Sequence, residues 1–145
     1  MSNAVDSANL LLKLYELRRE ETMRKARDFM ITFNPESIED IQAAMMGPQG
    51  GYLRMVTSYW DMAAAFVISG AIDAKMFDDV NGEHIAVFSK IQPFLPQIRE
   101  MFGQPKYMKN LEDVCLSAPG GLERVNATRE RMRRMLALRS AAAKS

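Results

Sequence analysis

The chain has 145 residues, a formal net charge of +1 and apolar residues at 48% of its positions. This length fits one domain over residues 1–145, and so much apolar content with so little net charge excludes a disordered chain. One cysteine and one histidine exclude a disulfide framework and the usual zinc cages, which need several sulfur or imidazole ligands, so no metal or other cofactor is expected.

The first predicted element is a long helix from Asp6 or Ser7 to Phe33, preceded by a flexible segment over residues 1–5. Its first half carries two apolar stripes, and the second stripe consists of Leu10, Leu14 and Leu17. At 1.5 Å per residue this helix would be ~42 Å long, about the width of the whole domain. A second copy of the chain lying over the second stripe would explain the apolar residues on two sides. We therefore expect self-association, with a dimer as its simplest form.

The middle of the chain predicts three further helices separated by clear breaks. Asn34 is the expected cap of the second helix, because Pro35 is favoured at the first helical position. A glycine-rich break then precedes a helix over 52–69 that is apolar on nearly every side, as is typical of a helix in the centre of a core. Gly70 suits the left-handed position after that helix, and Asp73 suits the cap of the short helix that follows.

The last third of the chain continues the helical spacing. Within residues 83–102, Pro93 and Pro96 each remove a backbone donor, which predicts a kink or a break in that helix. A short helix near 106–116 and a basic helix near 122–142 with a frayed tail complete the chain. The predicted fold class is therefore all-α: an irregular bundle of six or seven helices with a long N-terminal helix and a kinked helix near the two prolines.

The last predicted helix gathers basic charge. Residues 122–145 hold seven bases and two acids, whereas residues 36–113 hold eleven acids and six bases. The candidate contacts to an acidic partner are Arg124, Arg129, Arg131, Arg133 and Arg134. They suit a nucleic-acid backbone or an acidic protein. Because they flank the apolar stripe of the helix on both sides and no aromatic residue lies among them, the pattern favours helix packing over a nucleic-acid interface.

Few residues suggest chemistry. The lone His84 is expected at an exposed helix terminus, and Cys115 is expected to be buried as a small hydrophobe among apolar neighbours. No catalytic motif is present, so a non-enzymatic protein is expected. Arg18 lies on the main apolar stripe of the first helix, and Asp61 lies within the most apolar helix. If both are buried they must form an ion pair, because an isolated buried charge costs several kcal/mol; otherwise each reaches water at the edge of its helix.

No uncharged apolar stretch of the sequence is long enough to span a membrane as a helix. The longest charge-free run in its apolar middle, Met62 to Ile72, has eleven residues, whereas a membrane helix needs ~20. Near the N-terminus, Lys13 interrupts the run of leucines, so no signal peptide is predicted. We therefore expect a cytoplasmic protein without a membrane partner.

Several motifs resemble those of a bacterial all-helical family of unknown function. They are Leu14–Arg18, Ala26–Phe29, Tyr59-Trp60 with Ala64, Gly70–Asp73, and Pro96 with Ile98 and Arg99. The likeness covers about residues 10–116 and leaves the basic C-terminal helix outside. It implies an all-helical fold and gives no catalytic residues. The function expected is protein–protein interaction or self-association, with binding of nucleic acid or an acidic partner through the last helix as the alternative.

Overall fold

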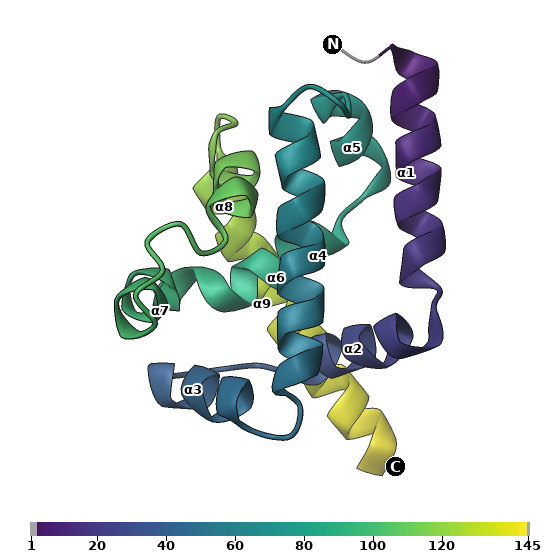
Figure 1. Ribbon diagram of the computed structural model, residues 1–145. Helices are drawn as coiled ribbons and strands as arrows, with labels where there is room; N and C mark the ends of the chain where they lie inside the picture. The colour runs from purple at the N-terminus through teal and green to yellow at the C-terminus, as the bar shows by residue number, and fades with distance from the viewer. Residues whose placement is uncertain (1–2, 145) are drawn as a thin grey trace.

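The computed structural model describes residues 3–144 (Figure 1). Within them the chain forms nine α-helices, one short 3-10 helix and no β-strand. The elements are α1 (Ala4–Arg18), α2 (Glu21–Thr32), α3 (Ile38–Met46), α4 (Gly50–Ile68), α5 (Ala74–Val80), α6 (Glu83–Ile91), the 3-10 helix Gln92–Phe94, α7 (Leu95–Met101), α8 (Lys109–Leu116) and α9 (Gly121–Lys144). The all-α class is confirmed, although the helices are more numerous than the six or seven predicted.

Helix α4 lies at the centre of the bundle, where its apolar sequence predicts it to lie (Figure 1). Its side chains Leu53, Trp60 and Ala63 are fully buried, and α2 and α8 pack most extensively against it. On the side toward α1, the hydroxyl of Tyr59 donates a hydrogen bond to the backbone oxygen of Leu14. Burial of a large apolar side chain contributes roughly 1.5–3 kcal/mol, so α4 is the element around which the others assemble.

The predicted continuous helix over residues 6–33 is wrong, because the chain turns sharply between α1 and α2 (Figure 1). Glu20 has an extended backbone, and its carboxylate accepts hydrogen bonds from the backbone N–H groups of Thr22 at 3.0 Å and Met23 at 2.8 Å. These bonds cap α2 and lower the pKa of the Glu20 carboxyl. The apolar stripe runs on through the break, so its periodicity does not reveal it. The inference of self-association from helix length therefore loses its basis.

The two ends of the chain are more regular than predicted. Asn3 caps α1 by accepting a hydrogen bond from the backbone N–H of Asp6 at 2.8 Å, so residues 4 and 5, expected to be flexible, are helical. Residues 1 and 2 of that expected segment lie outside the described residues. At the other end α9 continues to Lys144, and residue 145 of the expected frayed tail lies outside the described residues.

Lys90 of α6 holds the C-terminal end of α2, a role that the sequence pattern does not indicate. Its ammonium group is buried and donates hydrogen bonds to the backbone oxygens of Met30, of Ile31 at 2.9 Å and of Phe33 at 2.7 Å. The last carbonyl groups of a helix have no partner within the helix, and leaving them buried and unpaired is costly. Burial lowers the pKa of Lys90 to about 8.

Two predicted helix boundaries differ in the structure. Ser37 caps α3 in place of Asn34, because its hydroxyl accepts the backbone N–H of Asp40 at 3.2 Å. Of the kink or break predicted at the two prolines, the break occurs: residues 83–102 form α6 and α7 with the 3-10 turn between them, and not one kinked helix. Each of the two prolines lies in the first turn of its own helical segment, where the missing N–H removes no helical hydrogen bond.

The turn between α4 and α5 follows its prediction closely. Gly70 has a φ of 86°, a left-handed conformation that costs little only for glycine. Asp73 caps α5 by accepting a hydrogen bond from the backbone N–H of Met76 at 2.9 Å. The same Asp73 donates its own backbone N–H to the hydroxyl oxygen of Ser7 at 3.0 Å, which ties this turn to α1.

Candidate functional site

Arg18 lies in the last turn of α1, beside two aromatic rings. Its guanidinium carbon is 5.3 Å from the ring centroid of Tyr15 and 5.3 Å from that of Trp60. A cation above an aromatic face is attracted by the quadrupole of the ring. The Nε atom of Arg18 is buried without a hydrogen-bond partner, and no carboxylate within residues 3–144 forms an ion pair with this side chain. The rings therefore hold the positive charge without neutralising it.

The ion pair between Arg18 and Asp61, one of the two alternatives that the sequence left open, does not form, and both residues are only partly buried. The Asp61 carboxylate instead accepts hydrogen bonds from the backbone N–H of Leu111 at 2.9 Å and from Nδ2 of Asn110 at 3.3 Å, and so caps the first turn of α8. Asp61 directly follows Trp60, the ring that Arg18 contacts. Consecutive side chains on a helix diverge by about 100°, so Asp61 points away from Arg18.

Glu83, at the start of α6, accepts hydrogen bonds from Trp60 and from Arg27. Its Oε2 accepts the indole N–H of Trp60 at 3.0 Å, and its Oε1 lies 2.9 Å from both Nε and Nη2 of Arg27, with which it forms an ion pair. Arg27 also donates a hydrogen bond through Nη1 to the backbone oxygen of Arg18 at 3.3 Å. Four helices meet in this cluster, and its one carboxylate is fully engaged. The sequence pattern gave no signal for this pair, because its residues lie 56 positions apart.

A groove of about 310 Å³ runs between α1 and α5 with Arg18 in its wall. We call it the α1–α5 groove, and its lining residues are Ala8, Leu11, Leu12, Tyr15, Arg18, Met76, Val80 and Asn81. Most of these side chains are apolar. The groove thus combines an apolar surface with one cation that no acidic group of the described chain neutralises.

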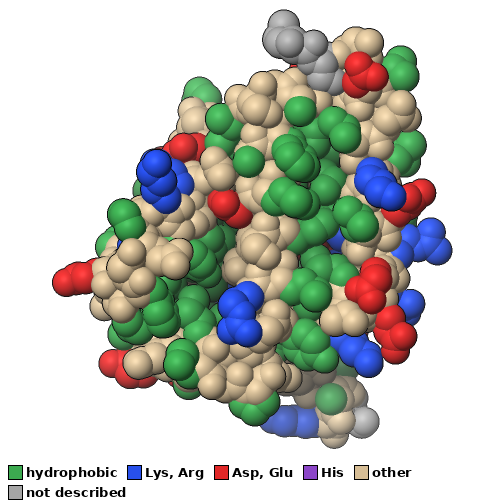
Figure 2. Space-filling view, in the orientation of Figure 1, with side chains coloured by type: hydrophobic (Ala, Val, Ile, Leu, Met, Phe, Trp, Pro, Cys, Tyr) green, Lys and Arg blue, Asp and Glu red, His purple; other side chains and the backbone are tan. Residues whose placement is uncertain are grey.

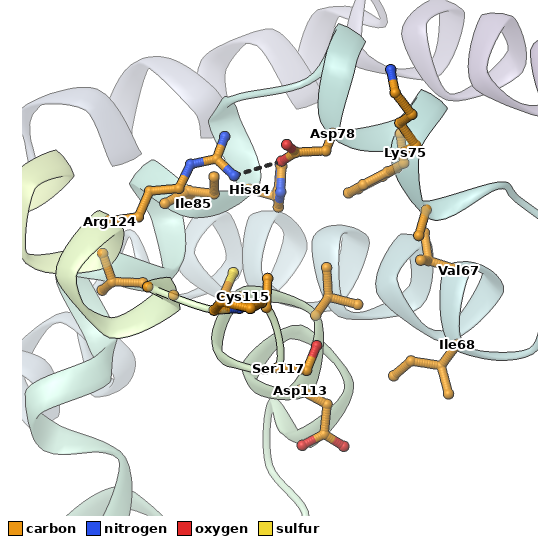
Figure 3. A pocket seen from close by; sticks show the side chains of 18 residues that line it. Val67, Ile68, Lys75, Asp78, His84, Ile85, Asp113, Cys115, Ser117 and Arg124 are labelled. Atoms are coloured by element: carbon orange, nitrogen blue, oxygen red, sulfur yellow. Dashed lines mark hydrogen bonds and ion pairs between the residues drawn. The ribbon is translucent and has the colours of Figure 1, made fainter.

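A second groove, of about 590 Å³, lies between α5, α6, α8 and the start of α9 (Figure 3). His84 and Cys115 both line it, and the ion pair between Asp78 and Arg124, 2.8 Å long, lies at its rim. The prediction of an exposed His84 is wrong, since only 1% of its surface is accessible, whereas the predicted burial of Cys115 is confirmed. The Nδ1 atom of His84 has no hydrogen-bond partner in the part of the chain that the structure describes.

Burial determines the protonation of both side chains in this second groove. It lowers the pKa of His84 to about 4 and raises the pKa of the Cys115 thiol to about 12. At neutral pH the imidazole is therefore uncharged and the thiol is protonated. A nucleophilic cysteine needs a stabilised thiolate, which this environment disfavours.

The basic helix α9 contacts the rest of the chain through its first half. Arg124 pairs with Asp78, and Arg129 donates to the backbone oxygen of Ser89 at 2.7 Å and to Oε1 of Gln92 at 2.8 Å. Two of the predicted partner-binding arginines are thus engaged within the chain. Of the other three, Arg133 pairs with Glu130 on the same helix, while Arg131 and Arg134 are exposed.

The predicted self-association leucines are not equivalent in the structure. Leu14 is buried against α4, so its assignment to an exposed contact surface is wrong. Leu10 and Leu17 remain exposed, at 38% and 43%. Figure 2 shows hydrophobic side chains gathered on the surface between α4 and α1. On α4, the exposed Met62 and Phe66 extend the apolar surface of the chain.

Within residues 3–144, no group of three or more His, Cys, Asp or Glu side chains is arranged to hold a metal ion. None of the helices in this range is long and apolar enough to cross a membrane. Comparisons with curated proteins and with solved structures give no match. Residues 3–117 match the family described as Domain of unknown function (DUF4760). This range includes α1 to α8 and leaves α9 outside, and the chain belongs to this family.

Proposed function

We propose that the protein is a non-enzymatic self-association module, and that two copies join through one side of α1. The observation that carries this proposal is a stripe of four residues spaced by four, three and four positions. We call it the α1 stripe, and its members are Asp6, Leu10, Lys13 and Leu17. At 100° per residue they fall within about 60° of one another on the helix. All four are exposed.

The charges of the α1 stripe are complementary to a second copy of the same stripe. Asp6 and Lys13 lie seven residues apart, about 10 Å along the axis, on either side of Leu10. In an antiparallel pair related by a two-fold axis near Leu10, Asp6 of one copy faces Lys13 of the other, twice. Among the described residues, the side chain of Lys13 forms one ion pair, an exposed contact to Glu16 at 3.9 Å, so it remains available to a partner.

Helix α4 adds apolar surface to the same face. Tyr59 reaches α1 through its hydroxyl, and Phe66 lies seven residues further along, on the same side of α4. The hydrophobic surface between the two helices in Figure 2 is therefore available to a partner that lies over α1. Exposed apolar surface of this kind favours protein contacts.

The non-enzymatic part of the proposal is supported by the protonation of the two reactive side chains. His84 is buried and uncharged at neutral pH, and the buried Cys115 thiol is protonated. A cytoplasmic location, expected from the sequence, belongs to the same proposal.

Sedimentation equilibrium at micromolar concentrations tests the self-association. Asp6→Lys places two lysines opposite each other and should shift the chain toward a 16.4 kDa monomer. The double variant Asp6→Lys/Lys13→Asp restores opposite charges and should restore the dimer. Leu138→Lys, an equally drastic change at a 70% exposed site on α9, should leave the mass unchanged. A monomeric wild-type chain, or a double variant no better than Asp6→Lys alone, would rule out the antiparallel pair.

A second candidate function is binding of an acidic partner or nucleic acid through the free half of α9. It is favoured by the exposure of Arg131, Arg134 and Arg139, none of which forms an ion pair within residues 3–144. Titration with labelled DNA, RNA and an acidic peptide over a salt series tests it, because binding through arginines weakens steeply as salt rises. Absence of binding at low salt would remove this candidate.

A further inference from the structure

We propose that the α1–α5 groove is a binding site for a small apolar carboxylate, whose carboxylate group pairs with the guanidinium of Arg18. The proposal does not rest on self-association. At 100° per residue, Ala8, Leu12 and Tyr15 lie about 140–160° from Leu10, so the groove and the α1 stripe occupy different sides of the helix.

The first argument is the unpaired state of Arg18. Its Nε is buried without an acceptor among residues 3–144, and the carboxylate that binds the same tryptophan, Glu83, is already paired with Arg27. Because Nε has almost no accessible surface, a ligand in the groove would bind the terminal nitrogens of the guanidinium, for which residues 3–144 supply no acceptor either. A carboxylate supplies an acceptor together with the negative charge that would balance the cation of Arg18.

The second argument is the geometry of the guanidinium group. Its carbon lies over the rings of both Tyr15 and Trp60, 5.3 Å from each centroid, so two aromatic side chains flank the group. A planar guanidinium binds a carboxylate through two parallel N–H···O bonds in its own plane. The two neighbouring rings restrict its motion, which lowers the entropy lost on binding.

The third argument is the size and lining of the groove. Its volume of about 310 Å³ lies at the lower end of the range for small-molecule sites, roughly 300–1,000 Å³. Leu11, Leu12, Met76 and Val80 provide an apolar surface along it, while Arg18 provides the charge. A ligand with a short hydrocarbon body and one terminal carboxylate matches both features. A groove of this volume is too small to hold a folded protein.

Trp60 makes the proposal measurable without a label. It is the only tryptophan in the chain, and it contacts the guanidinium that the ligand would bind. We therefore propose a fluorescence titration of the full chain with octanoate, octanol and octylamine. These probes share the hydrocarbon body and differ in the polar group. Octanoate should bind at least about tenfold more tightly than octanol, and octylamine should bind most weakly, because its cation faces Arg18.

Variants of Arg18 distinguish the contribution of its charge to octanoate affinity from that of the apolar groove. Arg18→Met should reduce octanoate affinity about tenfold, to the level of octanol, and leave octanol affinity unchanged. Arg18→Lys keeps the positive charge but loses the planar guanidinium, so its octanoate affinity should lie between those of the wild type and Arg18→Met. Arg19→Met, at the exposed neighbouring arginine, is the control and should bind octanoate as the wild type does.

Several outcomes would overturn the proposal. Equal affinity of the wild-type chain for octanoate and octanol would show that no cation recognises the carboxylate. Full octanoate binding by Arg18→Lys and Arg18→Met would place the carboxylate elsewhere, and absence of any octanoate signal would remove the site. If Arg18→Met fails to fold, the proposal is still tested by comparing octanoate with octanol on the wild-type chain and by measuring octanoate binding to Arg18→Lys. Binding of acetyl-leucyl-leucine without binding of octanoate would assign the groove to peptide C-termini and contradict a small-molecule site.

Discussion

The ammonium group of Lys90 lies 2.7 Å from the backbone oxygen of Phe33, which is 57 residues earlier in the chain. Through this bond and two others to Met30 and Ile31, one buried side chain on α6 satisfies the end of α2. No carboxylate within residues 3–144 pairs with Lys90, so carbonyl dipoles stabilise its charge there. This arrangement makes the cap sensitive to the identity of a single residue.

Lys90→Met should therefore destabilise the fold even though methionine is apolar and of similar length. The substitution leaves three carbonyl groups at the end of α2 without their donor, and we expect a loss of about 3 kcal/mol in the free energy of unfolding. Urea denaturation followed by circular dichroism measures it. The control Lys75→Met removes an exposed lysine of α5 and should change stability by less than about 0.5 kcal/mol. Similar values for the two variants would contradict the capping role.

Titration of His84 should make the stability of the fold depend on pH below neutrality. Burial lowers its folded-state pKa from 6.5 to about 4, so between these values the unfolded chain binds a proton that the folded chain does not. Stability therefore falls as pH falls from 6.5 to 4, by up to roughly 3 kcal/mol. Because carboxylates also titrate at the lower end, the test compares the wild-type chain with His84→Phe at pH 7 and pH 5. The variant should lose less stability over this interval, and equal losses would show that His84 does not titrate in this way.

Removing the side-chain cap of α8 should cost about 1–2 kcal/mol. Asp61→Ala deprives the backbone N–H of Leu111 of its acceptor, whereas Asp61→Asn keeps an oxygen that accepts the same bond. We expect the alanine variant to be clearly less stable than the asparagine variant in thermal unfolding. The order of the two variants is the critical result, because a pure charge effect would make them equal.

Gly121 should be essential to the packing of α9 on α8. A Cβ atom placed there would lie 2.6 Å from the backbone oxygen of Cys115 and 3.0 Å from Cα of Leu116. Backbone atoms cannot move aside cheaply, so Gly121→Ala should destabilise the chain by about 2 kcal/mol or more. Gly51→Ala, where the nearest atom is 3.9 Å away at the end of the Arg54 side chain, should be neutral or slightly stabilising in the same assay.

The sequence pattern correctly predicted those elements that are determined by residues close together in the chain. The central position of α4 followed from an apolar surface on nearly every side, and the turn at Gly70 and Asp73 followed from turn and cap chemistry within a few residues. The break at Glu20 was missed, because glutamate is seldom a helix cap and the apolar stripe continues across it. Ser37 was missed because Pro35 offered a plausible start two residues earlier.

The candidate sites were harder to predict, because they depend on contacts between distant residues. Arg18 was correctly singled out as an unusual charge on an apolar stripe, but its partners turned out to be aromatic rings and not Asp61. The pairing of Arg27 with Glu83 and the capping role of Lys90 link positions more than 50 residues apart. No periodicity within one helix contains such information, since it records only which face is buried.

Helix α9 starts in close contact with α8, and Figure 1 shows it passing behind α4 and extending beyond α2. Its packed first half fixes its direction, and the part after Met132 extends a further ~18 Å from the body. In a dimer joined through α1, the two free ends would be kept at one spacing and orientation. A target with two acidic patches at that spacing would then gain avidity from the pair, which a single copy cannot provide.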